Sequence, residues 1–420
     1  MRILHVIREV TDGGASLGML RQCIDGPPGF TQTVASLRRP EPAALARFAR
    51  SGVEVIRDPA AIMDAVRSCD GVQIEWWNNP EVNAFLTSTD LPPCRLLLHS
   101  RGHFDAPYMC PSALLLSRVD LCSVTTPGAA GNPAFVRARQ AAGLPPPPCV
   151  YSAAPTVSPP DRPGPAEAPA GRPGGEIVFA YLGTVEPIKM HRAALPMAAA
   201  ILRQVPTARF RFAGDGTLDA YRREAEALGI ADRVDFTGFI EQADAFLQAA
   251  DIFFYPLNPF TYATSEKALQ EAMAAGLPCI VFPHGGIRDL VTPDCAAVVD
   301  DCAAFVAAAV ALARDPGRRA AMGRAAGRRL ATAEHILHWR DHLARTWVRL
   351  VDRPRRPRAA LAIPRGQLFA RCTDTAAHDL GSLDAEAQAD FRQVAAFVTD
   401  AYGLDVPSLP GGALPAEDHR

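Results

Sequence analysis

Lysine is almost absent from this 420-residue chain: Lys189 and Lys267 are the only two, and the other 41 of its 43 basic residues are arginines. The formal net charge is −2, and no dense stripe of basic residues with interleaved aromatic residues occurs. This composition argues against a protein that binds nucleic acid. The basic run at 353–358, RPRRPR, is interrupted by proline and predicts a solvated linker, with weak contact to a membrane surface as the alternative.

Long apolar runs and paired cysteines are missing too. No stretch approaches the ~18 apolar residues of a membrane-spanning helix, and the N-terminus MRILHVIREV lacks the long apolar region and cleavage site of a signal peptide. The ten cysteines form no C-x-x-C pair and no Cys/His cluster at zinc spacing. We therefore expect a cytoplasmic protein without a transmembrane segment, in which the cysteines are small apolar side chains.

The chain does contain two alternating series of strands and helices, the pattern of parallel sheets covered by helices. The first series, in residues 1–153, predicts strands at 3–7, 31–37, 53–56, 72–76, 95–99, 121–124 and 149–151. The second series, in residues 176–334, predicts strands at 177–182, 209–213, 234–237, 252–255, 278–282 and 296–299. This organisation predicts an α/β protein with two Rossmann-like, doubly wound domains that face each other across a cleft.

Residues outside the two series have their own patterns. Residues 154–175 are rich in Pro, Gly and Ala, which predicts a linker between the domains. A helix is expected at 335–352, with two tryptophans on one face, and we expect it to cross back to the N-terminal domain. Residues 353–420 form an extension with one amphipathic helix, at 384–402, and a disordered end. Further helices are predicted at 218–228, 268–275, 305–314 and 317–331.

Five short segments should face the cleft, because ligands bind outside the carboxyl ends of parallel strands. They are DGGA at 12–15, GTVEPIK at 183–189, AGDGT at 213–217, YATSEKALQEAMAAG at 262–276 and PHGG at 283–286. Their glycines permit close approach of the backbone to an anion, and the helices that follow aim N–H groups at it. Each loop taken alone could equally be a turn.

Both lysines fall in these segments. Lys189 ends the second segment, and Lys267 lies in the first helical turn of the fourth. An ammonium is a compact charge that can lie between two phosphates, so the lysines predict a diphosphate site; two surface lysines left by chance are the alternative. Ser265 is expected to cap the helix and Glu266 to lie in its first turn. Glu271 could accept hydrogen bonds from two ribose hydroxyls, or be an exposed helix acid.

Several motifs resemble one known family in order and spacing. GTVEPIK, AGDG, DRVDFTGFI and EAMAAGLPCIVFPHGG, within residues 178–291, resemble the C-terminal half of glycosyltransferase family 4, the retaining enzymes of GT-B fold. In the N-terminal half only MRILHVI, the Gly13–Gly14 loop and LLLHSRGHF resemble the family. The resemblance implies a GT-B fold and transfer of a sugar, a hexose in particular, from a nucleoside diphosphate sugar to an acceptor. The expected donor is a UDP-sugar.

The resemblance also implies roles for individual residues. Lys189 and Lys267 are expected to stabilise the leaving diphosphate, and His99 or His103 to lie beside the donor sugar and the acceptor. The expected donor-binding residues are Gly13, Gly14, Gly183, Thr184, Lys189, Gly214, Gly216, Gly238, Phe239, Ile240, Thr264, Ser265, Glu266, Lys267 and Glu271. No Asp-x-Asp pair ends a strand, so neither a metal nor another cofactor is expected beside the sugar donor.

Two positions depart from the family pattern. Thr184 stands where the family often has an arginine, a charge that Lys267 or Arg192 could replace. Ala263 stands where the family has the first of two acids, and its side chain cannot bind a sugar hydroxyl. These departures favour, as one alternative, a non-catalytic sugar-nucleotide-binding protein. An epimerase of the same fold is the other alternative, although it needs several acids and a histidine around the sugar, and Ala263 counts against it.

The sequence does not specify the acceptor, which could be a small molecule, a glycan or a lipid. Acceptor pockets in this architecture come from the N-terminal domain, where the chain resembles the family least. Trp76 and Trp77, at a predicted strand end, could form an aromatic wall there or be a buried structural pair.

Overall fold

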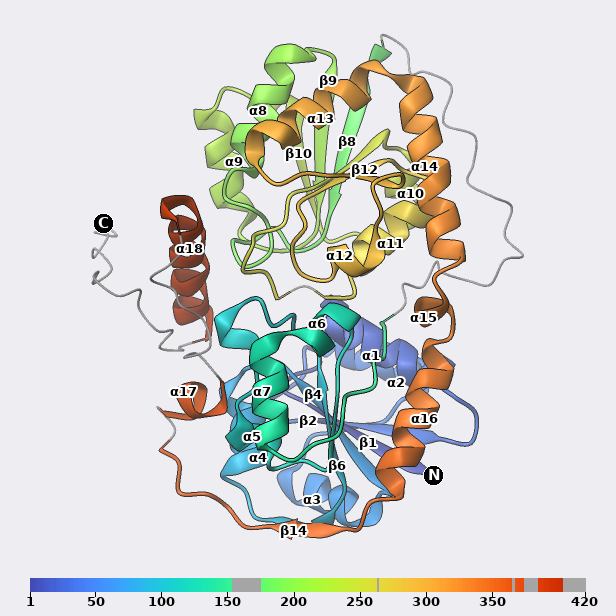
Figure 1. Cartoon of the computed structure of the whole chain (residues 1–420), viewed down its shortest axis with the longest axis vertical. Coiled ribbons are helices and arrows are strands. Elements are labelled where there is room, and N and C mark those ends of the chain that lie inside the picture. The colour runs from blue at the N-terminus through green and yellow to red at the C-terminus, as the bar shows by residue number, and fades with distance from the viewer. Residues whose placement is uncertain (153–174, 263, 365–366, 374–383, 403–420) are drawn as a thin grey trace.

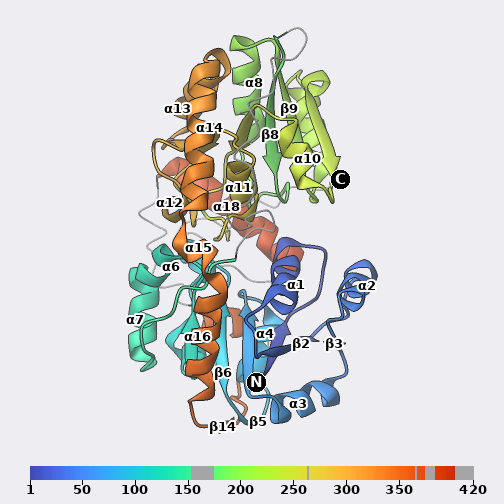
Figure 2. The same cartoon turned by 90° about the vertical axis from the view of Figure 1, so that its right-hand side faces the viewer.

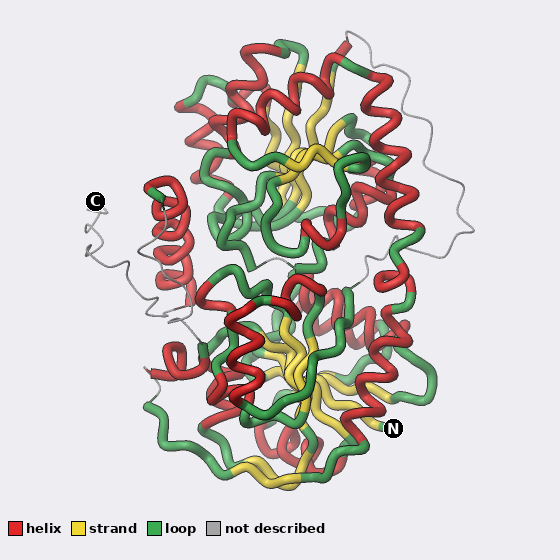
Figure 3. Tube along the Cα trace, viewed as in Figure 1, coloured by secondary structure: helices red, strands yellow, loops and turns green. Residues whose placement is uncertain are grey.

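The computed structural model describes residues 1–152, 175–262, 264–364, 367–373 and 384–402. Two lobes lie one above the other along the long axis of the molecule, each with a parallel sheet inside and helices outside (Figures 1 and 3). The predicted linker at 154–175, apart from Gly175, and the predicted disordered end lie outside the described residues.

The N-terminal lobe contains a six-stranded sheet with the order β3-β2-β1-β4-β6-β7, in which every pairing is parallel. The order reverses between β1 and β4, which makes their carboxyl ends the expected place for a ligand. The strands are β1 Arg2–Ile7, β2 Thr31–Ser36, β3 Val55–Ile56, β4 Gly71–Trp76, β6 Leu96–Ser100 and β7 Leu121–Ser123. The helices are α1 Gly14–Asp25, α2 Pro42–Arg50, α3 Pro59–Ser68, α4 Pro80–Thr87, α5 Ala113–Leu116, α6 Pro127–Gly131 and α7 Pro133–Ala141.

The C-terminal lobe repeats this arrangement, with the order β10-β9-β8-β11-β12-β13. Its central strands are nearly continuous apolar runs, since helices bury both faces of the sheet. The strands are β8 Ile177–Leu182, β9 Ala208–Ala213, β10 Val234–Gly238, β11 Ile252–Tyr255, β12 Cys279–Val281 and β13 Ala296–Val298. The helices are α8 Ala194–Gln204, α9 Leu218–Ala227, α10 Ala243–Gln248, α11 Lys267–Ala274, α12 Ile287–Leu290, α13 Cys302–Arg314 and α14 Pro316–Ala331.

Twelve of the thirteen predicted strands are present; the exception is the strand predicted at 149–151. Residues 149–151 make a single bridge, from Cys149 to Val124, and form no strand. An unpredicted antiparallel pair joins β5 Leu91–Cys94 to β14 Arg356–Arg358 at the far end of the N-terminal lobe (Figure 1). The sequence LPPC of β5 does not predict this strand, because proline cannot donate a backbone hydrogen bond and is normally confined to edge strands.

The basic run at 353–358 is therefore not a free linker: Arg358 is buried, while Arg353, Pro354, Arg356 and Pro357 remain exposed. Arg356 and Arg358 each place a guanidinium nitrogen 2.6 Å from the buried carboxylate of Asp120. Arg358 is itself 6% exposed. These arginines bind the extension to the N-terminal lobe.

The helices after the second sheet return to the first lobe. The predicted helix at 335–352 is broken at His338 into α15 Glu334–Leu337 and α16 Trp339–Val351. Trp347 is fully buried and donates a hydrogen bond from Nε1 to Oε1 of Gln73 in β4, at 2.7 Å. Figure 2 shows α16 running along the N-terminal lobe.

Two more helices follow in the extension, α17 Leu368–Cys372 and α18 Ala385–Tyr402. The second of these corresponds to the predicted helix at 384–402, and it lies beside the junction of the two lobes (Figures 1 and 2). Among the described residues no helix combines the length and the apolar character needed to cross a membrane.

A buried carboxylate lies beneath the interlobe face of the N-terminal sheet. Glu75 in β4 is fully buried and accepts hydrogen bonds from Nδ1 of His5 at 2.9 Å, from Gln73 Nε2 at 2.8 Å and from Arg101 Nε at 2.5 Å. Burial alone raises the pKa of Glu75, but the Arg101 guanidinium and the His5 hydrogen bond outweigh it and hold this pKa well below its usual range. The ionised carboxylate therefore fixes Arg101 at the end of β6.

We predict that Glu75→Gln lowers the free energy of unfolding by about 3 kcal/mol at neutral pH, because it leaves the buried Arg101 charge without its partner. Since the folded-state pKa is depressed, the contribution of Glu75 is present above its unfolded pKa and is lost as the pH falls through the acidic range. Urea denaturation at several pH values measures both effects. Glu54→Gln, on an exposed position, is the control; equal losses in the two variants would contradict the assignment.

Candidate functional site

A cavity of about 900 Å³ opens between the two lobes. Its N-terminal wall is formed by the loop after β1, the start of α1 and the residues that follow β4 and β6. Its C-terminal wall is formed by the loops after β8, β9 and β10 and by the start of α11. The cavity thus lies at the carboxyl ends of both sheets, where the sequence predicts it.

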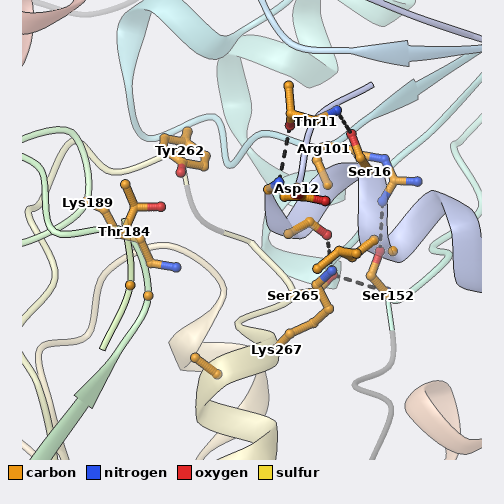
Figure 4. A pocket seen from close by; sticks show the side chains of 18 of the residues that line it. Thr11, Asp12, Ser16, Arg101, Ser152, Thr184, Lys189, Tyr262, Ser265 and Lys267 are labelled. Atoms are coloured by element: carbon orange, nitrogen blue, oxygen red, sulfur yellow. Dashed lines mark hydrogen bonds between the residues drawn. The ribbon is translucent and has the colours of Figure 1, made fainter. Parts of the chain in front are cut away.

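Both lysines line this cavity, from different segments of the C-terminal lobe (Figure 4). Lys267 is the first residue of α11, and its Nζ donates a hydrogen bond to the carbonyl oxygen of Gly14 in the N-terminal lobe. A side chain at Gly18 would press on the same ammonium, since a Cβ there would lie 2.9 Å from Nζ. Lys189 lies near Thr184 and Tyr262, with Nζ 5.7 Å from the ring centroid of Tyr255.

The electrostatics of α11 make Lys267 and Glu271 a titrating pair. Burial, the Arg101 charge and the Lys189 charge lower the pKa of Lys267 to about 7, against the opposing effect of Glu271. Burial raises the pKa of Glu271 to about 7, although the Lys267 charge opposes the shift. Both groups therefore change charge near neutral pH, and an anion in the cavity would hold Lys267 protonated.

The start of α11 differs from the predicted cap. Glu266, and not Ser265, occupies the N-cap position, with a left-handed backbone at φ 45° that is unusual for a residue other than glycine. Ser265 instead accepts a hydrogen bond at Oγ from the backbone N–H of Ser152, at 3.2 Å. This contact ties the entry to α11 to the end of the N-terminal lobe.

The carboxyl group of Glu266 is 4% exposed and lies in the cavity wall. Oε2 accepts a hydrogen bond from the hydroxyl of Tyr255 at 2.7 Å, while Oε1 has no hydrogen-bond partner among the described residues. Burial raises the pKa of Glu266, and the Lys189 charge opposes this shift. A strained backbone that presents a half-satisfied buried carboxyl group is typical of functional sites.

Of the predicted donor-binding residues, most line the cavity and two do not. The lining residues are Gly13, Gly14, Gly183, Thr184, Lys189, Gly214, Phe239, Ile240, Thr264, Ser265, Glu266, Lys267 and Glu271. Gly216 and Gly238 lie outside the lining, and so does the segment PHGG at 283–286. Gly216 has a φ of +138° and lies against the backbone of Val185, with which it forms a bridge, so loop packing accounts for this glycine.

The two candidate histidines lie outside the cavity lining as well. His99 is fully buried in β6, its Nδ1 lies 2.8 Å from Ser123 Oγ, and burial lowers its pKa to about 3. His103 is 4% exposed and has its Nδ1 3.2 Å from the Asp105 carboxylate. Neither histidine is thus brought to the cavity surface, because His99 points into the sheet from β6 and His103 faces Asp105.

The residue after β6 that does reach the cavity is Arg101. Its guanidinium lies between Glu75 and Ser152, with Nη1 3.1 Å from the Ser152 hydroxyl oxygen. Arg101 directly follows β6 in the segment LLLHSRGHF, so its place at a strand end was the signal that could have identified it. The two adjacent tryptophans differ in position. Trp76 is fully buried, whereas Trp77 is half-buried and lines the cavity.

Of the two proposed replacements for the missing family arginine, only Lys267 lies in the cavity. Arg192 is not among the lining residues, and its Nε is 2.8 Å from the Asp390 carboxylate of α18. The position of the missing first acid, Ala263, lies outside the described residues.

Sequence comparison identifies the C-terminal lobe. Residues 176–315 match the model of the family "Glycosyl transferases group 1". The chain is 33% identical over 147 residues to 2-deoxystreptamine N-acetyl-D-glucosaminyltransferase of Streptomyces fradiae, covering 33% of this chain and 34% of the relative. It is 30% identical over 138 residues to a GDP-mannose-dependent phosphatidylinositol dimannoside mannosyltransferase of Mycobacterium tuberculosis, covering 32% and 35%. The matched region spans about a third of the length of each of these relatives.

Structural comparison extends the similarity to both lobes. The Anabaena protein HepE in complex with UDP has a TM-score of 0.66 at 15% identity, and covers 83% of this chain and 100% of its own. WaaG, a glycosyltransferase involved in lipopolysaccharide biosynthesis, has a TM-score of 0.59 at 13% identity and covers 84% and 100%. These similarities confirm the predicted GT-B fold, and with the family match they confirm the resemblance to glycosyltransferases.

If the cavity binds a nucleoside diphosphate, as the family resemblance implies, the titrating pair on α11 predicts that it binds most tightly near neutral pH; UDP is the probe. A phosphate beside Lys267 would favour its protonated form, so affinity should fall about tenfold per pH unit above neutrality. Ribose hydroxyls would donate to the ionised form of Glu271, so affinity should also fall in the acidic range. Titration calorimetry measures the profile. Lys267→Met should flatten the alkaline limb and Glu271→Gln the acidic limb; limbs that persist in both variants would contradict the assignment.

Proposed function

We propose that this chain transfers a sugar from a nucleoside diphosphate sugar to an acceptor hydroxyl, since residues 176–315 match the family model "Glycosyl transferases group 1". The observation that carries the proposal is the convergence of the only two lysines in the chain on one interlobe cavity that also holds the start of α11. A diphosphate that leaves the sugar gains negative charge, and preorganised cations stabilise that charge most in the transition state.

In the proposed site the lysines bind the diphosphate and the acids bind the sugars. Lys189 and Lys267 lie on either side of the leaving group, with the Gly13–Gly14 backbone closing over it. We assign Glu271 to the ribose and Glu266 to the donor sugar; Oε1 of Glu266 is buried and lacks a hydrogen-bond partner among the described residues, so the carboxyl group must turn toward the cavity when the sugar binds. This second role takes the place of the acid that Ala263 does not provide.

The reaction we propose retains the configuration of the sugar. The bond from the anomeric carbon to the diphosphate oxygen breaks, and a bond from the acceptor oxygen forms on the same face. The acceptor proton passes to the departing phosphate oxygen. The geometry supports this route over one that uses a histidine base, since His99 and His103 both lie outside the cavity lining. For the same reason it disfavours the epimerase alternative, which needs a histidine among acids around the sugar.

A UDP-sugar is the proposed donor, and GDP-mannose is the second candidate. One structure of HepE contains UDP and glucose, and a second structure contains UDP-glucose. The mycobacterial relative, in contrast, is described as GDP-mannose-dependent. The exposed side chain of Phe239 and the neighbouring Ile240 line the end of the cavity where a base would lie. The acceptor would lie against the N-terminal wall, beside Trp77.

We predict that incubation of the protein with a panel of nucleotide sugars and cell metabolites releases a nucleoside diphosphate from one of them, with the sugar appearing on an acceptor by mass spectrometry. Lys189→Ala should slow this release by about 2–4 kcal/mol in activation free energy, because a cation at the leaving group is lost. Arg203→Ala, on α8 and outside the cavity lining, is the control. Unchanged turnover in Lys189→Ala would contradict the assigned role, and conversion of the donor sugar itself would indicate the epimerase.

The lysines also predict activity that is independent of metal ions. One group among the described residues could hold an ion, namely His191, Cys302 and Glu386, and none of the three lines the cavity. Addition of EDTA should therefore change the initial rate of diphosphate release by less than about twofold, since no transition-state charge is assigned to a metal. A loss of activity that Mg²⁺ or Mn²⁺ restores would contradict this part of the proposal.

A further inference from the structure

Helix α18 packs against both lobes, although it lies far beyond the matched glycosyltransferase domain in the sequence. Phe391 and Val394 of α18 are buried in one apolar cluster with Tyr108 of the N-terminal lobe and with Ile188 and Phe260 of the C-terminal lobe. The rings of Phe391 and Phe260 meet edge to face, with centroids 5.2 Å apart. In the same cluster the hydroxyl of Tyr108 donates a hydrogen bond to the carbonyl oxygen of Phe260, at 2.5 Å.

This apolar cluster, which we call the α18 cluster, is continuous with the wall of the cavity. Members of the cluster, or side chains packed against it, line the cavity from both lobes: Trp77, Tyr108, Met109, Ile188 and Tyr262. The helix therefore supports the wall from behind, and a change in its packing would reach the site through these side chains.

An ion pair links the same helix to the loop that carries Lys189. Asp390 is 2% exposed, and its two oxygens face different residues of that loop. Oδ1 accepts a hydrogen bond from Arg192 Nε at 2.8 Å, and Oδ2 lies 3.5 Å from His191 Nε2. A buried carboxylate with two cationic or donor partners fixes their positions strongly, because loss of one partner leaves a buried charge uncompensated.

Both ring nitrogens of His191 have a partner, and only Nε2 faces Asp390. Its Nδ1 accepts a hydrogen bond from the backbone N–H of Ala193 at 3.1 Å, so Nε2 carries the proton in the neutral ring and faces Asp390. This arrangement leaves no lone pair for a metal ion and disfavours a metal site at His191, Cys302 and Glu386. The histidine is better explained as an anchor.

The two contacts of α18 lie on either side of Lys189. Ile188, the preceding residue, packs in the α18 cluster, and His191 and Arg192 follow within three positions. On the other side of the loop, backbone hydrogen bonds connect Lys189 to Asn258 at 2.8 Å and His191 to Pro256 at 2.8 Å. Lys189 therefore lies on a short loop that α18 contacts on one side and the backbone at Pro256 and Asn258 contacts on the other.

We propose that α18 is a positioning element of the site: Asp390, through His191 and Arg192, and Phe391, through its packing, hold the loop that directs Lys189 at the donor diphosphate. The role rests on the proposed function of Lys189. This role explains why the buried ion pair of Asp390 and Arg192 lies outside the cavity. It also explains why Arg192, which the sequence suggested as a phosphate ligand, pairs with an acid of the extension instead.

The scarcity of lysine allows a direct test on the full-length protein. Reductive methylation with ¹³C-formaldehyde labels only Lys189, Lys267 and the N-terminal amine, and it retains their charges. Lys189→Arg assigns one of the two side-chain signals by removing it. Asp390→Asn should shift or broaden the Lys189 signal and leave the Lys267 signal in place. Arg192→Gln, which removes a partly exposed partner, should act in the same direction and serves if Asp390→Asn does not fold.

Arg392→Gln is the matched control, because Arg392 is exposed on the same helix and its described hydrogen bond is to Gln388. It should move neither lysine signal. Spectra in which Asp390→Asn and Arg192→Gln leave the Lys189 signal unchanged, or move both lysine signals equally, would overturn the positioning role. These spectra do not depend on activity, so they test α18 even if no sugar donor is found.

Turnover then separates positioning from stability. In the presence of Lys189, Asp390→Asn should lower kcat for diphosphate release about tenfold or more, whereas in a Lys189→Ala background it should lower kcat less than about twofold. A merely structural helix would give equal falls in both backgrounds, together with a lower Tm, and that result would overturn the proposal. Absence of diphosphate release from the unsubstituted protein would count against the proposed function instead.

Discussion

The site depends on the placement of two lysine side chains in the wall of one cavity between two sheets. For Lys267 this placement is unfavourable, because burial and the neighbouring positive charges destabilise its protonated form. The low pKa of Lys267 expresses this cost. The Gly14 carbonyl and the Glu271 carboxyl offset part of it, and an anionic ligand would offset more. The protonated form of Lys267 would therefore be stabilised by the phosphate-bearing ligand that we propose.

The fold supplies the positions from which these charges act. In each lobe the strand order reverses beside the first strand, so that the loops after the central strands meet at the interlobe face. On the N-terminal side the buried Glu75 holds Arg101 at the edge of the cavity. On the C-terminal side α11 and the loop after β8 provide one lysine each. Two helices beyond the second sheet, α16 and, in the extension, α18, pack against this arrangement from outside.

The sequence predicted those parts of the molecule that depend on local pattern. Apolar runs identified the strands of both sheets, and glycine-rich loops with the lysines identified most of the C-terminal wall of the cavity but little of its N-terminal wall. It missed the pair of β5 and β14, because their residues are 262 or more positions apart and contain proline. It also missed the left-handed backbone of Glu266 and the inward orientation of His99. The conformation of Glu266 accompanies its contact with Tyr255, and the orientation of His99 accompanies its contact with Ser123. No local sequence pattern contains these tertiary contacts.

A crystal structure of the protein with UDP, or with GDP if UDP does not bind, tests the central claim most directly. The account predicts that the diphosphate lies in the interlobe cavity, with phosphate oxygens within about 3.2 Å of the Nζ atoms of Lys189 and Lys267. A nucleotide that binds elsewhere, or one whose phosphates contact neither lysine, would contradict it.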